Sequence, residues 1–174
     1  AVTAESLCYM PGFGIGDAAT TLAGQSYGAK RPELVRSFGY ICVCMGMVVM
    51  TVMGAVMYVA APLMMDIMTP VESIRALGIE VLRIEAWAEP MYAASIVAYG
   101  AMVGVGDTKW PAVMNFGSIW LVRIPIAAIL APTMGLLGVW IAMAFELTFR
   151  GCIFLWRLIS GVWYKKIAFA SESL

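Results

Sequence analysis

Five long apolar runs, separated by short segments that hold most of the basic residues, set the pattern of this 174-residue chain. The clearest run extends from Phe38 to Met65 and carries no charged side chain before Asp66. A helix needs about 20 apolar residues to cross the hydrocarbon core of a bilayer, so this run is long enough to cross it with a tilt. Helices of soluble proteins are seldom apolar on every face over such a length. The pattern therefore predicts helices that span a membrane.

The same pattern predicts an all-α fold, a polytopic transmembrane helix bundle with no soluble domain. The expected spans cover about residues 7–28, 38–62, 84–105, 111–131 and 137–160. Composition agrees, because 62% of the residues are hydrophobic, 13% are charged and the mean hydropathy is +0.87. Only short loops remain between the spans.

The distribution of basic residues predicts how the bundle is oriented. Lys and Arg that flank membrane spans are preferentially retained in the cytoplasm. If the spans alternate in direction, seven basic residues fall on one side: Lys30, Arg31, Arg36, Lys109, Arg157, Lys165 and Lys166. The opposite loops hold only Arg75 and Arg83. We therefore expect the first span to enter from the outside and the C-terminus to be cytoplasmic.

The positions of the cysteines do not fit a metal or haem centre. Cys8, Cys42, Cys44 and Cys152 all lie within apolar runs, and the chain has no Cys-x-x-Cys pair and no histidine. These are the residues and spacings on which zinc and haem sites depend. We expect no metal site, and we expect the cysteines to pack as small hydrophobic side chains.

A polar stripe follows the first predicted span. Asp17, Thr21 and Gln25 recur at four-residue steps in a segment made largely of Gly, Ala and Leu. Charged side chains inside a span are costly and normally mark the interior of a bundle or a water-filled path. The stripe should therefore face a cavity or another helix, and the glycines around it permit close helix packing.

A second stripe follows the third predicted span. Its members recur at steps of three or four residues: Glu85, Glu89, Tyr92, Ser95 and Tyr99. Glu89 lies about a turn and a half inside the expected boundary, and Pro90 removes a backbone donor beside it. In one interpretation Glu89 is a membrane-embedded acid with a functional role. In the other, Glu85 and Glu89 lie in the outer headgroup layer and pair with Arg83.

Three further charged residues lie near mid-depth of the last two spans. Glu146 and Arg150 are four residues apart and so share one helix face, where they can form an ion pair. Arg123 is the third member of this expected set of structural ion pairs. Alternatively, the two arginines face a cavity and bind an anionic substrate.

Four stretches, in order, resemble motifs of the multidrug and toxic compound extrusion (MATE) family. Gly14–Arg31 resembles the second helix of one lobe, and Gly100–Pro111 resembles the Gly-Ala-Leu-Arg-Gly-Ala-Gly-Asp-Thr signature that closes the fourth helix. Trp120–Pro125 resembles the fifth helix, and the stretches at 138–142, 146–150 and 157–163 resemble the sixth. The resemblance covers nearly the whole chain. One departure is Val103, which stands where the signature has arginine.

The resemblance implies a fold of two six-helix lobes around a central cavity, of which this chain is most of the C-terminal lobe. The chain begins without an initiator Met or a basic leader, and we expect that the preceding helix and the N-terminal lobe belong to a longer parent protein. These missing parts, the lipid bilayer and a small-molecule substrate would be the partners. The implied location is the bacterial cytoplasmic (inner) membrane.

The function that the resemblance implies is cation-coupled efflux, in which entry of Na⁺ or H⁺ drives export of amphipathic, often cationic compounds. No other cofactor is expected. In relatives, acids on the seventh and tenth helices of the parent carry coupling in this lobe. On the helix that corresponds to the tenth, the candidate coupling residues are Glu89 and Glu85, with Tyr92 as the other residue that could occupy the position of the usual acid. Asp17, on the first polar stripe, is a further candidate that the family pattern does not predict. Candidate residues of the substrate cavity are Thr21, Gln25, Tyr92, Ser95 and Tyr99.

Other functions fit the sequence less well. A flippase for a lipid-linked precursor, from the same superfamily, would have a larger and more basic cavity, and a membrane assembly subunit would transport nothing. Gly104–Asp107 matches the Gly-x-Gly-Asp string of intramembrane aspartyl proteases, which need two carboxylates that share a proton. Asp107 instead falls in a loop next to Lys109 and Pro111, where it is expected to serve as a turn or cap residue. We therefore expect no enzyme activity.

Overall fold

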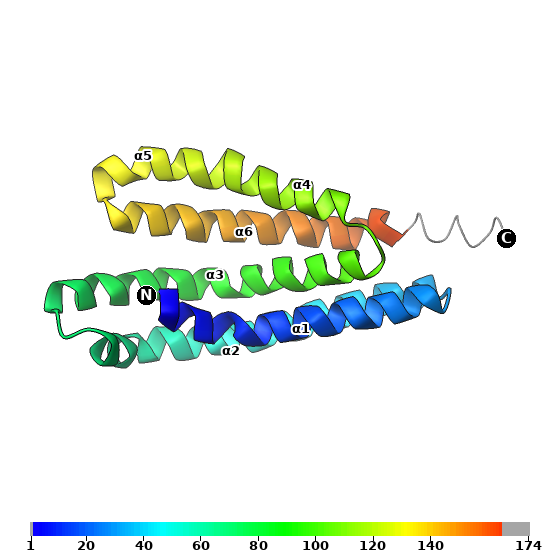
Figure 1. Cartoon of the computed structure of the whole chain (residues 1–174), viewed down its shortest axis with the longest axis horizontal. Helices are drawn as coiled ribbons and strands as arrows, with labels where there is room; N and C mark the ends of the chain where they lie inside the picture. The colour runs from blue at the N-terminus through cyan, green and yellow to red at the C-terminus, as the bar shows by residue number, and fades with distance from the viewer. Residues whose placement is uncertain (1, 165–174) are drawn as a thin grey trace.

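The computed structural model describes residues 2–164, which fold into long helices joined by short turns (Figure 1). In chain order these are α1 (Val2–Gly28), α2 (Pro32–Met68), α3 (Glu72–Gly104), α4 (Lys109–Ser118), a π-helical turn (Ile119–Arg123), α5 (Ile124–Met134) and α6 (Leu136–Ser160). The segments α4, π turn and α5 follow one another without a break, so they form one rod. The part of the chain that the structure describes contains no strand, and the expected all-α fold is confirmed.

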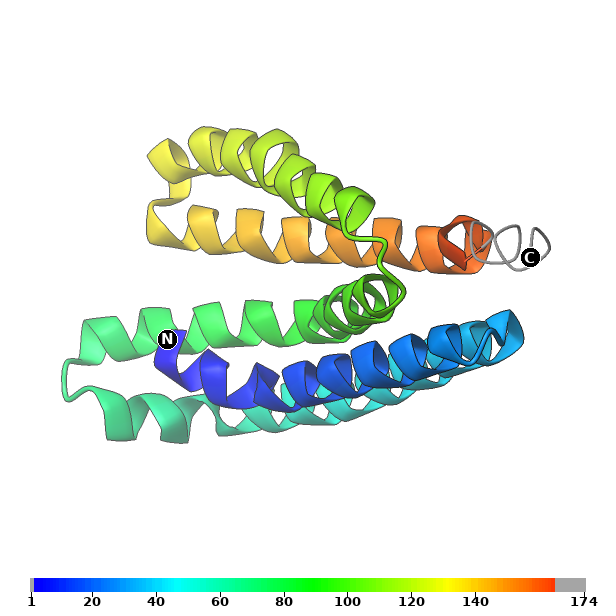
Figure 2. The same ribbon diagram turned by 45° about the vertical axis from the view of Figure 1, so that its right-hand side comes forward.

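The rods pack in two groups, which meet at α3. One group is α1, α2 and α3, and the other is the hairpin of α4–α5 with α6, which Figure 2 shows leaning away from the first group at one end. α3 joins the two groups, because it packs against α1 and α2 in the first and against α6 in the second. Every functional feature described below lies on or beside α3.

Small residues let α1 and α3 approach each other closely. A Cβ atom on Gly100 would meet the carbonyl oxygen of Gly16, and one on Gly104 would meet the carbonyl oxygen of Thr20. On the other helix, a Cβ on Gly24 would lie 3.2 Å from the carbonyl oxygen of Gly104. The two backbones therefore touch, as in other membrane helix pairs with small residues at four-residue spacing.

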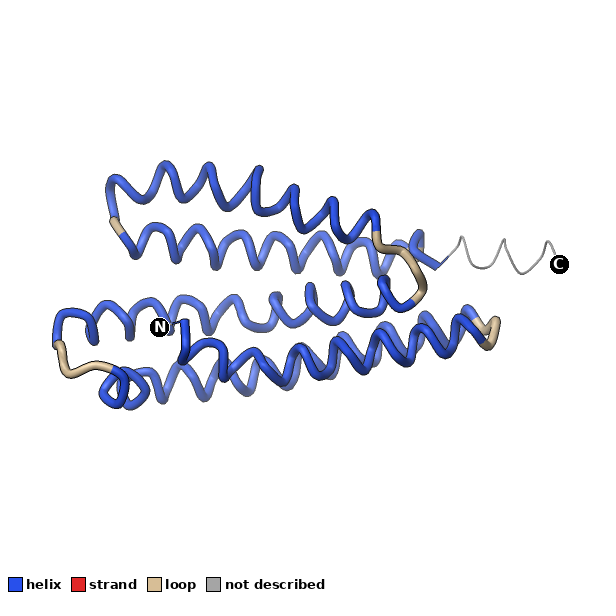
Figure 3. The backbone as a smooth tube through the Cα atoms, in the orientation of Figure 1, coloured by secondary structure: helices blue, strands red, loops and turns tan. Residues whose placement is uncertain are grey.

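The turns between the rods are short, as the tan segments of Figure 3 show. Pro32 begins α2, where its missing N–H costs no helical hydrogen bond. Gly135, with φ 60° and ψ −135°, joins α5 to α6 in a conformation that side-chain-bearing residues rarely adopt. Gly161 ends α6 in the left-handed conformation that is common at helix C-termini.

The helices extend beyond the predicted spans at several ends. α2 has 37 residues and α3 has 33, which is more than a bilayer requires. Among the described residues, three segments are long and apolar enough to cross a membrane by length and composition alone: Pro32–Met68, Lys109–Met134 and Leu136–Ser160. α1 and α3 carry the polar stripes. Where each rod enters and leaves the bilayer stays a prediction.

Candidate functional site

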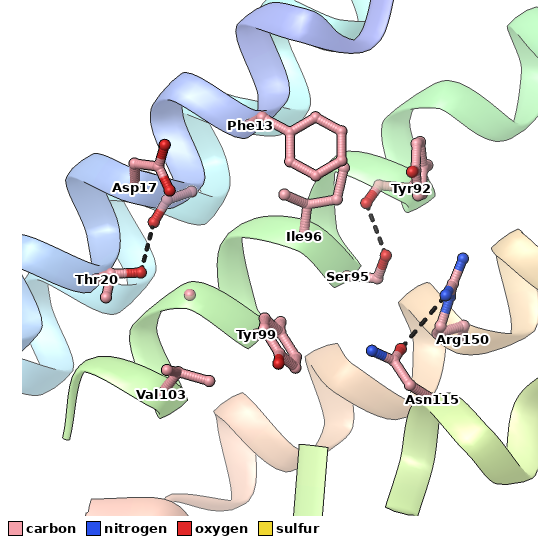
Figure 4. Close-up of a pocket in the computed structure, with 12 residues that line it drawn as sticks. Phe13, Asp17, Thr20, Tyr92, Ser95, Ile96, Tyr99, Val103, Asn115 and Arg150 are labelled. Carbon is pink, nitrogen blue, oxygen red and sulfur yellow. Dashed lines mark hydrogen bonds between the residues drawn. The ribbon is translucent and has the colours of Figure 1, made fainter. Parts of the chain in front are cut away.

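A cavity of about 440 Å³ lies between α1, α3, α4 and α6 (Figure 4). Its lining comes from α1 (Phe13, Gly16, Asp17 and Thr20), α3 (Tyr92, Ser95, Ile96, Tyr99, Gly100 and Val103), α4 (Asn115) and α6 (Arg150). The lining is aromatic and apolar with a few polar groups, which is typical of small-molecule sites.

The α3 wall contains the three predicted cavity residues of the second stripe. The Ser95 hydroxyl donates a hydrogen bond to the carbonyl oxygen of Tyr92 at 2.7 Å, so it is satisfied within the helix. The Tyr99 ring packs edge-on against Phe154, with 6.4 Å between ring centroids. Figure 4 shows Tyr92, Ser95 and Tyr99 in succession along one side of the cavity. Val103 ends this wall, at the position where the family signature has arginine.

The α1 wall differs from the predicted stripe. Asp17 lines the cavity, whereas Thr21 and Gln25 are exposed residues outside it. The Thr21 hydroxyl donates to the carbonyl oxygen of Asp17 at 3.0 Å, within its own helix. Thr20 takes the place expected for Thr21, because the contact of Gly16 with α3 fixes how α1 is rotated about its axis. The spacing of Gly16, Thr20 and Gly24 was the sequence signal for this rotation.

A buried polar network connects α4 with α6. Glu146 is fully buried, and its Oε1 accepts a hydrogen bond from the Ser118 hydroxyl at 2.5 Å. Arg150 Nε lies 3.3 Å from the same oxygen, and Arg150 Nη1 donates to Asn115 Oδ1 at 3.3 Å. The guanidinium also lies over the Tyr92 ring, 5.7 Å from its centroid. Glu146 thus balances the charge that Arg150 brings to the cavity wall.

A second cavity, of about 420 Å³, adjoins the first at Tyr92 and Arg150. Tyr92 and Arg150 line both cavities, so the two side chains separate them. Glu5, Tyr9 and Arg123 also line the second cavity. Within residues 2–164, Arg123 forms no ion pair shorter than 4 Å, in contrast to Arg150.

Three acids are buried in the three-helix group, and one of them, Glu5, lines the second cavity. Glu85 and Glu89 each have 2% of their surface exposed, and Glu5 has 6%. The Oε2 atoms of Glu85 and Glu89 have no hydrogen-bond partner among the described residues. Glu5 lies close enough for its charge to act on both carboxyls. The same three-helix group contains an apolar cluster that includes Cys8, Met57 and Leu82.

The structure changes two expectations about these acids. The pairing of Glu85 and Glu89 with Arg83 is absent from the described part of the chain, because the Arg83 guanidinium lies over the Tyr58 ring instead, 5.1 Å from its centroid. Sequence reasoning missed Glu5, because the first span was expected to begin at residue 7 although α1 begins at Val2. The described residues contain no group of three His, Cys, Asp or Glu side chains that could hold a metal ion.

Pro90 separates the buried acids from the cavity wall along α3. It has no N–H to donate a helical hydrogen bond to the carbonyl oxygen of Ala86, one turn earlier. Gly54 of α2 packs here, and a Cβ on Gly54 would lie 2.9 Å from that oxygen and 3.3 Å from the Cβ of Glu89. The absence of a side chain at Gly54 thus leaves room for both the free carbonyl and Glu89.

At the opposite end of α3, the loop to α4 is held against α6. Arg157 Nη2 donates to Asp107 Oδ2 at 2.5 Å, and its guanidinium lies 5.5 Å from the centroid of the Trp110 ring. The side chains of Arg157 and Asp107 are 11% and 17% exposed. Asp107 is therefore more than a turn residue, because it ties the loop to α6.

Comparison with known proteins identifies relatives over nearly the whole chain. It is 30% identical over 176 residues to "Probable multidrug resistance protein NorM" of Thermotoga maritima, covering 98% of this chain and 37% of that protein. It is 29% identical over 164 residues to the protein of the same name from Mesorhizobium japonicum, covering 90% of this chain and 35% of that protein. The chain therefore spans about a third of the length of these relatives.

Solved structures give the same fold. An inward-facing multidrug resistance MATE family transporter of the MOP superfamily superposes with a TM-score of 0.81 at 20% identity, over 91% of this chain and 38% of that one. A MATE protein in complex with MaL6 also gives 0.81, at 19% identity, over 91% of this chain and 37% of that one. The sequence model of the MatE family matches residues 1–129. The family resemblance is thereby confirmed, and the chain belongs to the MatE family of membrane transporters.

Proposed function

We propose that the full-length protein is a cation-coupled multidrug antiporter, and that this chain supplies its buried acids and one wall of its substrate cavity. The observation that carries the proposal is the burial of Glu85 and Glu89, each with a carboxyl oxygen that has no hydrogen-bond partner within residues 2–164. The names of the relatives support the multidrug part of the proposal.

In this proposal the acids bind H⁺ or Na⁺. A buried carboxylate without a partner is unfavourable, so a proton or a cation that neutralises it gains free energy from doing so. Glu89 is the leading coupling residue, because it lies next to the unsatisfied turn of α3 at Pro90. Glu85 would be the second coupling candidate on α3, and Asp17 would act at the cavity.

The cavity suits amphipathic cations. The rings of Phe13, Tyr92 and Tyr99 offer apolar and π surfaces, and Asp17 offers a negative charge at the same wall. Neutralising the acids on α3 would change how α3 packs, and α3 also carries this wall. Binding of the cation and of the substrate would then be coupled in both directions.

A flippase for an anionic lipid-linked precursor is the second candidate, because Arg150 lines both cavities and Arg123 lines the second. Arg150 already contacts Glu146, however, and this contact reduces the positive charge that the cavity presents. A basic substrate path would then depend mainly on Arg123. The buried acids therefore favour the antiporter.

We further propose that the protein lies in a bacterial inner membrane with the C-terminal end of this chain in the cytoplasm. Lys30, Arg31, Arg36, Lys109 and Arg157 all lie at or near the end of the bundle where α1 meets α2 and α3 meets α4, and they favour the cytoplasm there. Lys165 and Lys166, which contribute to the same prediction, lie outside the described residues. The N-terminal lobe and the preceding helix would complete the central cavity.

Transport by the full-length protein in vesicles tests the proposal. An imposed Na⁺ or H⁺ gradient should drive movement of ethidium against its concentration gradient, and collapse of that gradient should stop it. Ethidium movement that ignores both gradients would refute the antiporter. Movement of a fluorescent polyprenyl-phosphate lipid between leaflets without ethidium transport would support the flippase.

A further inference from the structure

A groove between α2 and α3 lies on the outside of the three-helix group, away from the substrate cavity. It has a volume of about 340 Å³ and runs along residues 51–59 of α2 and 86–90 of α3. Its walls offer few polar groups. The hydroxyl of Thr51 donates to the carbonyl oxygen of Met47 at 2.5 Å, and so it is satisfied within its own helix.

The groove is open toward the surroundings of the bundle. Trp87 is 80% exposed and Val59 is 78% exposed on its two sides. Gly54 lines the groove between them and packs against α3, where a Cβ would lie 2.9 Å from the carbonyl oxygen of Ala86. In a membrane protein, an exposed apolar hollow of this kind contacts lipid.

A positive charge stands at one end of the groove. Arg83 lies one turn before Trp87 on α3, and its guanidinium rests 5.1 Å from the centroid of the Tyr58 ring, which itself lines the groove. Arg83 is exposed and has no acid within ion-pair distance among the residues that the structure describes. Its donors are therefore available to a ligand that enters the groove.

The dimensions match one leaflet of a bilayer. Val59 follows Thr51 by eight positions in the helix, which corresponds to about 12 Å along α2. Half of a hydrocarbon core measures about 15 Å. Arg83 immediately precedes the span predicted at 84–105, and in that prediction it stands at the level of the headgroups.

We propose that this groove is a binding site for an anionic phospholipid of the outer leaflet. One acyl chain lies in the groove over Gly54 between α2 and Trp87, and the phosphate accepts hydrogen bonds from Arg83. Arginine binds phosphate through paired, charge-assisted hydrogen bonds. Phosphatidylglycerol is the representative ligand, because its headgroup adds no positive charge.

Other occupants fit the groove less well. A second copy of the chain, packed through the same face about a two-fold axis, would bring two Arg83 guanidinium groups toward each other at the same depth. A helix of another protein segment would have to present an acid to Arg83 inside the headgroup layer. A phospholipid supplies both the apolar chain and the negative charge in a single molecule.

Photocrosslinking in vesicles tests the site. The full-length protein is reconstituted with phosphatidylglycerol that carries a diazirine in one acyl chain, and labelled peptides are identified by mass spectrometry. Labels should concentrate at residues 51–59 and 86–90. Unlabelled phosphatidylglycerol should compete about fivefold better than phosphatidylcholine, which corresponds to one arginine–headgroup interaction.

Two variants and two matched controls make the test specific. Ala55→Phe fills the groove from an exposed position and should abolish its labelling, whereas Val48→Phe adds the same ring two turns away on α2 and should not. Arg83→Gln should remove the preference for phosphatidylglycerol, whereas Arg31→Gln, at the other end of α2, should preserve it.

Three results would overturn the proposal: labelling no stronger than at other exposed positions of α2, labelling unchanged by Ala55→Phe, or an unlabelled groove because another protein segment or a second copy fills it. Labelling does not require transport, so the outcome is independent of the proposed antiport.

Discussion

Glu89 is the single side chain on which the proposed coupling depends most. Its carboxyl group is buried beside Gly54, and one of its oxygens has no hydrogen-bond partner in the part of the chain that the structure describes. We predict that Glu89→Gln abolishes gradient-driven export of ethidium while the protein still inserts and folds, because the amide keeps the shape but cannot take up a proton or hold Na⁺ by charge. Transport in vesicles, with protein yield and melting temperature as folding checks, measures this.

Glu80→Gln is the matched control for this prediction, because Glu80 lies on the same helix but is exposed. It should transport at the unmodified rate. If Glu89→Gln exported normally while Asp17→Asn did not, the coupling acid would be Asp17 and the ranking of the two would be reversed.

The candidate site was partly predictable at the level of residues. The three-to-four-residue spacing along α3 brought Tyr92, Ser95 and Tyr99 to one wall, because helical periodicity alone decides which residues share a face. The same reasoning expected Thr21 and Gln25 at the cavity, whereas the structure places them on an exposed face of α1, since rotation of α1 depends on its contact with α3. Hydropathy also gives no sharp start for a helix, and Glu5 was missed for that reason.

At the scale of elements, the contact of α1 with α3 depends on glycine. We predict that Gly104→Ala destabilises the protein by about 1–3 kcal/mol, because the new methyl group would meet the carbonyl oxygen of Thr20, and backbone yields less readily than a side chain. The measurement is thermal denaturation in detergent.

The control for this prediction is Gly14→Ala, since a Cβ on Gly14 has no atom within 4 Å. It should be neutral or stabilising by about 0.5–1 kcal/mol, because alanine favours the helix. Equal melting temperatures for Gly104→Ala and the unmodified protein would contradict the close packing of the two helices.

The number and order of the rods followed from hydropathy, but their ends and one irregularity did not. Hydropathy reports the part of a helix that lies in lipid, whereas backbone hydrogen bonds continue into the headgroup layer, and α2 and α3 accordingly exceed their predicted spans. The π turn at Ile119–Arg123 could not be predicted from an apolar run, because the wider turn changes the backbone hydrogen bonds and not the composition.

At the scale of the whole molecule, the loop between α3 and α4 ties the two helix groups together through Asp107 and Arg157. We predict that Arg157→Gln destabilises the protein by about 2 kcal/mol, because it leaves a mostly buried carboxylate without its charged partner. Thermal denaturation in detergent measures the loss. Lys109→Gln, which removes an exposed charge from α4 beside the same loop, should leave the melting temperature unchanged, and an equal loss in both variants would contradict a specific role for the pair.

The orientation of the bundle can be tested directly. In a cysteine-free background, a cysteine at Ala29 should react with a membrane-impermeant maleimide only from the cytoplasmic side, and one at Ser73 only from the outside. Both positions are exposed and lie at opposite ends of α2. The reverse labelling would show that the basic residues were misread as cytoplasmic.

The break in hydrogen bonding at Pro90 has a consequence for how the molecule moves. It divides α3 into one arm that carries Glu85 and Glu89 and another that carries Tyr92, Ser95 and Tyr99. With no N–H at the junction to hold the Ala86 carbonyl, the arms share a natural pivot. Under the proposed coupling, a change of charge at Glu85 or Glu89 would displace the arm that carries Tyr92, Ser95 and Tyr99, and so would alter the shape of the cavity wall.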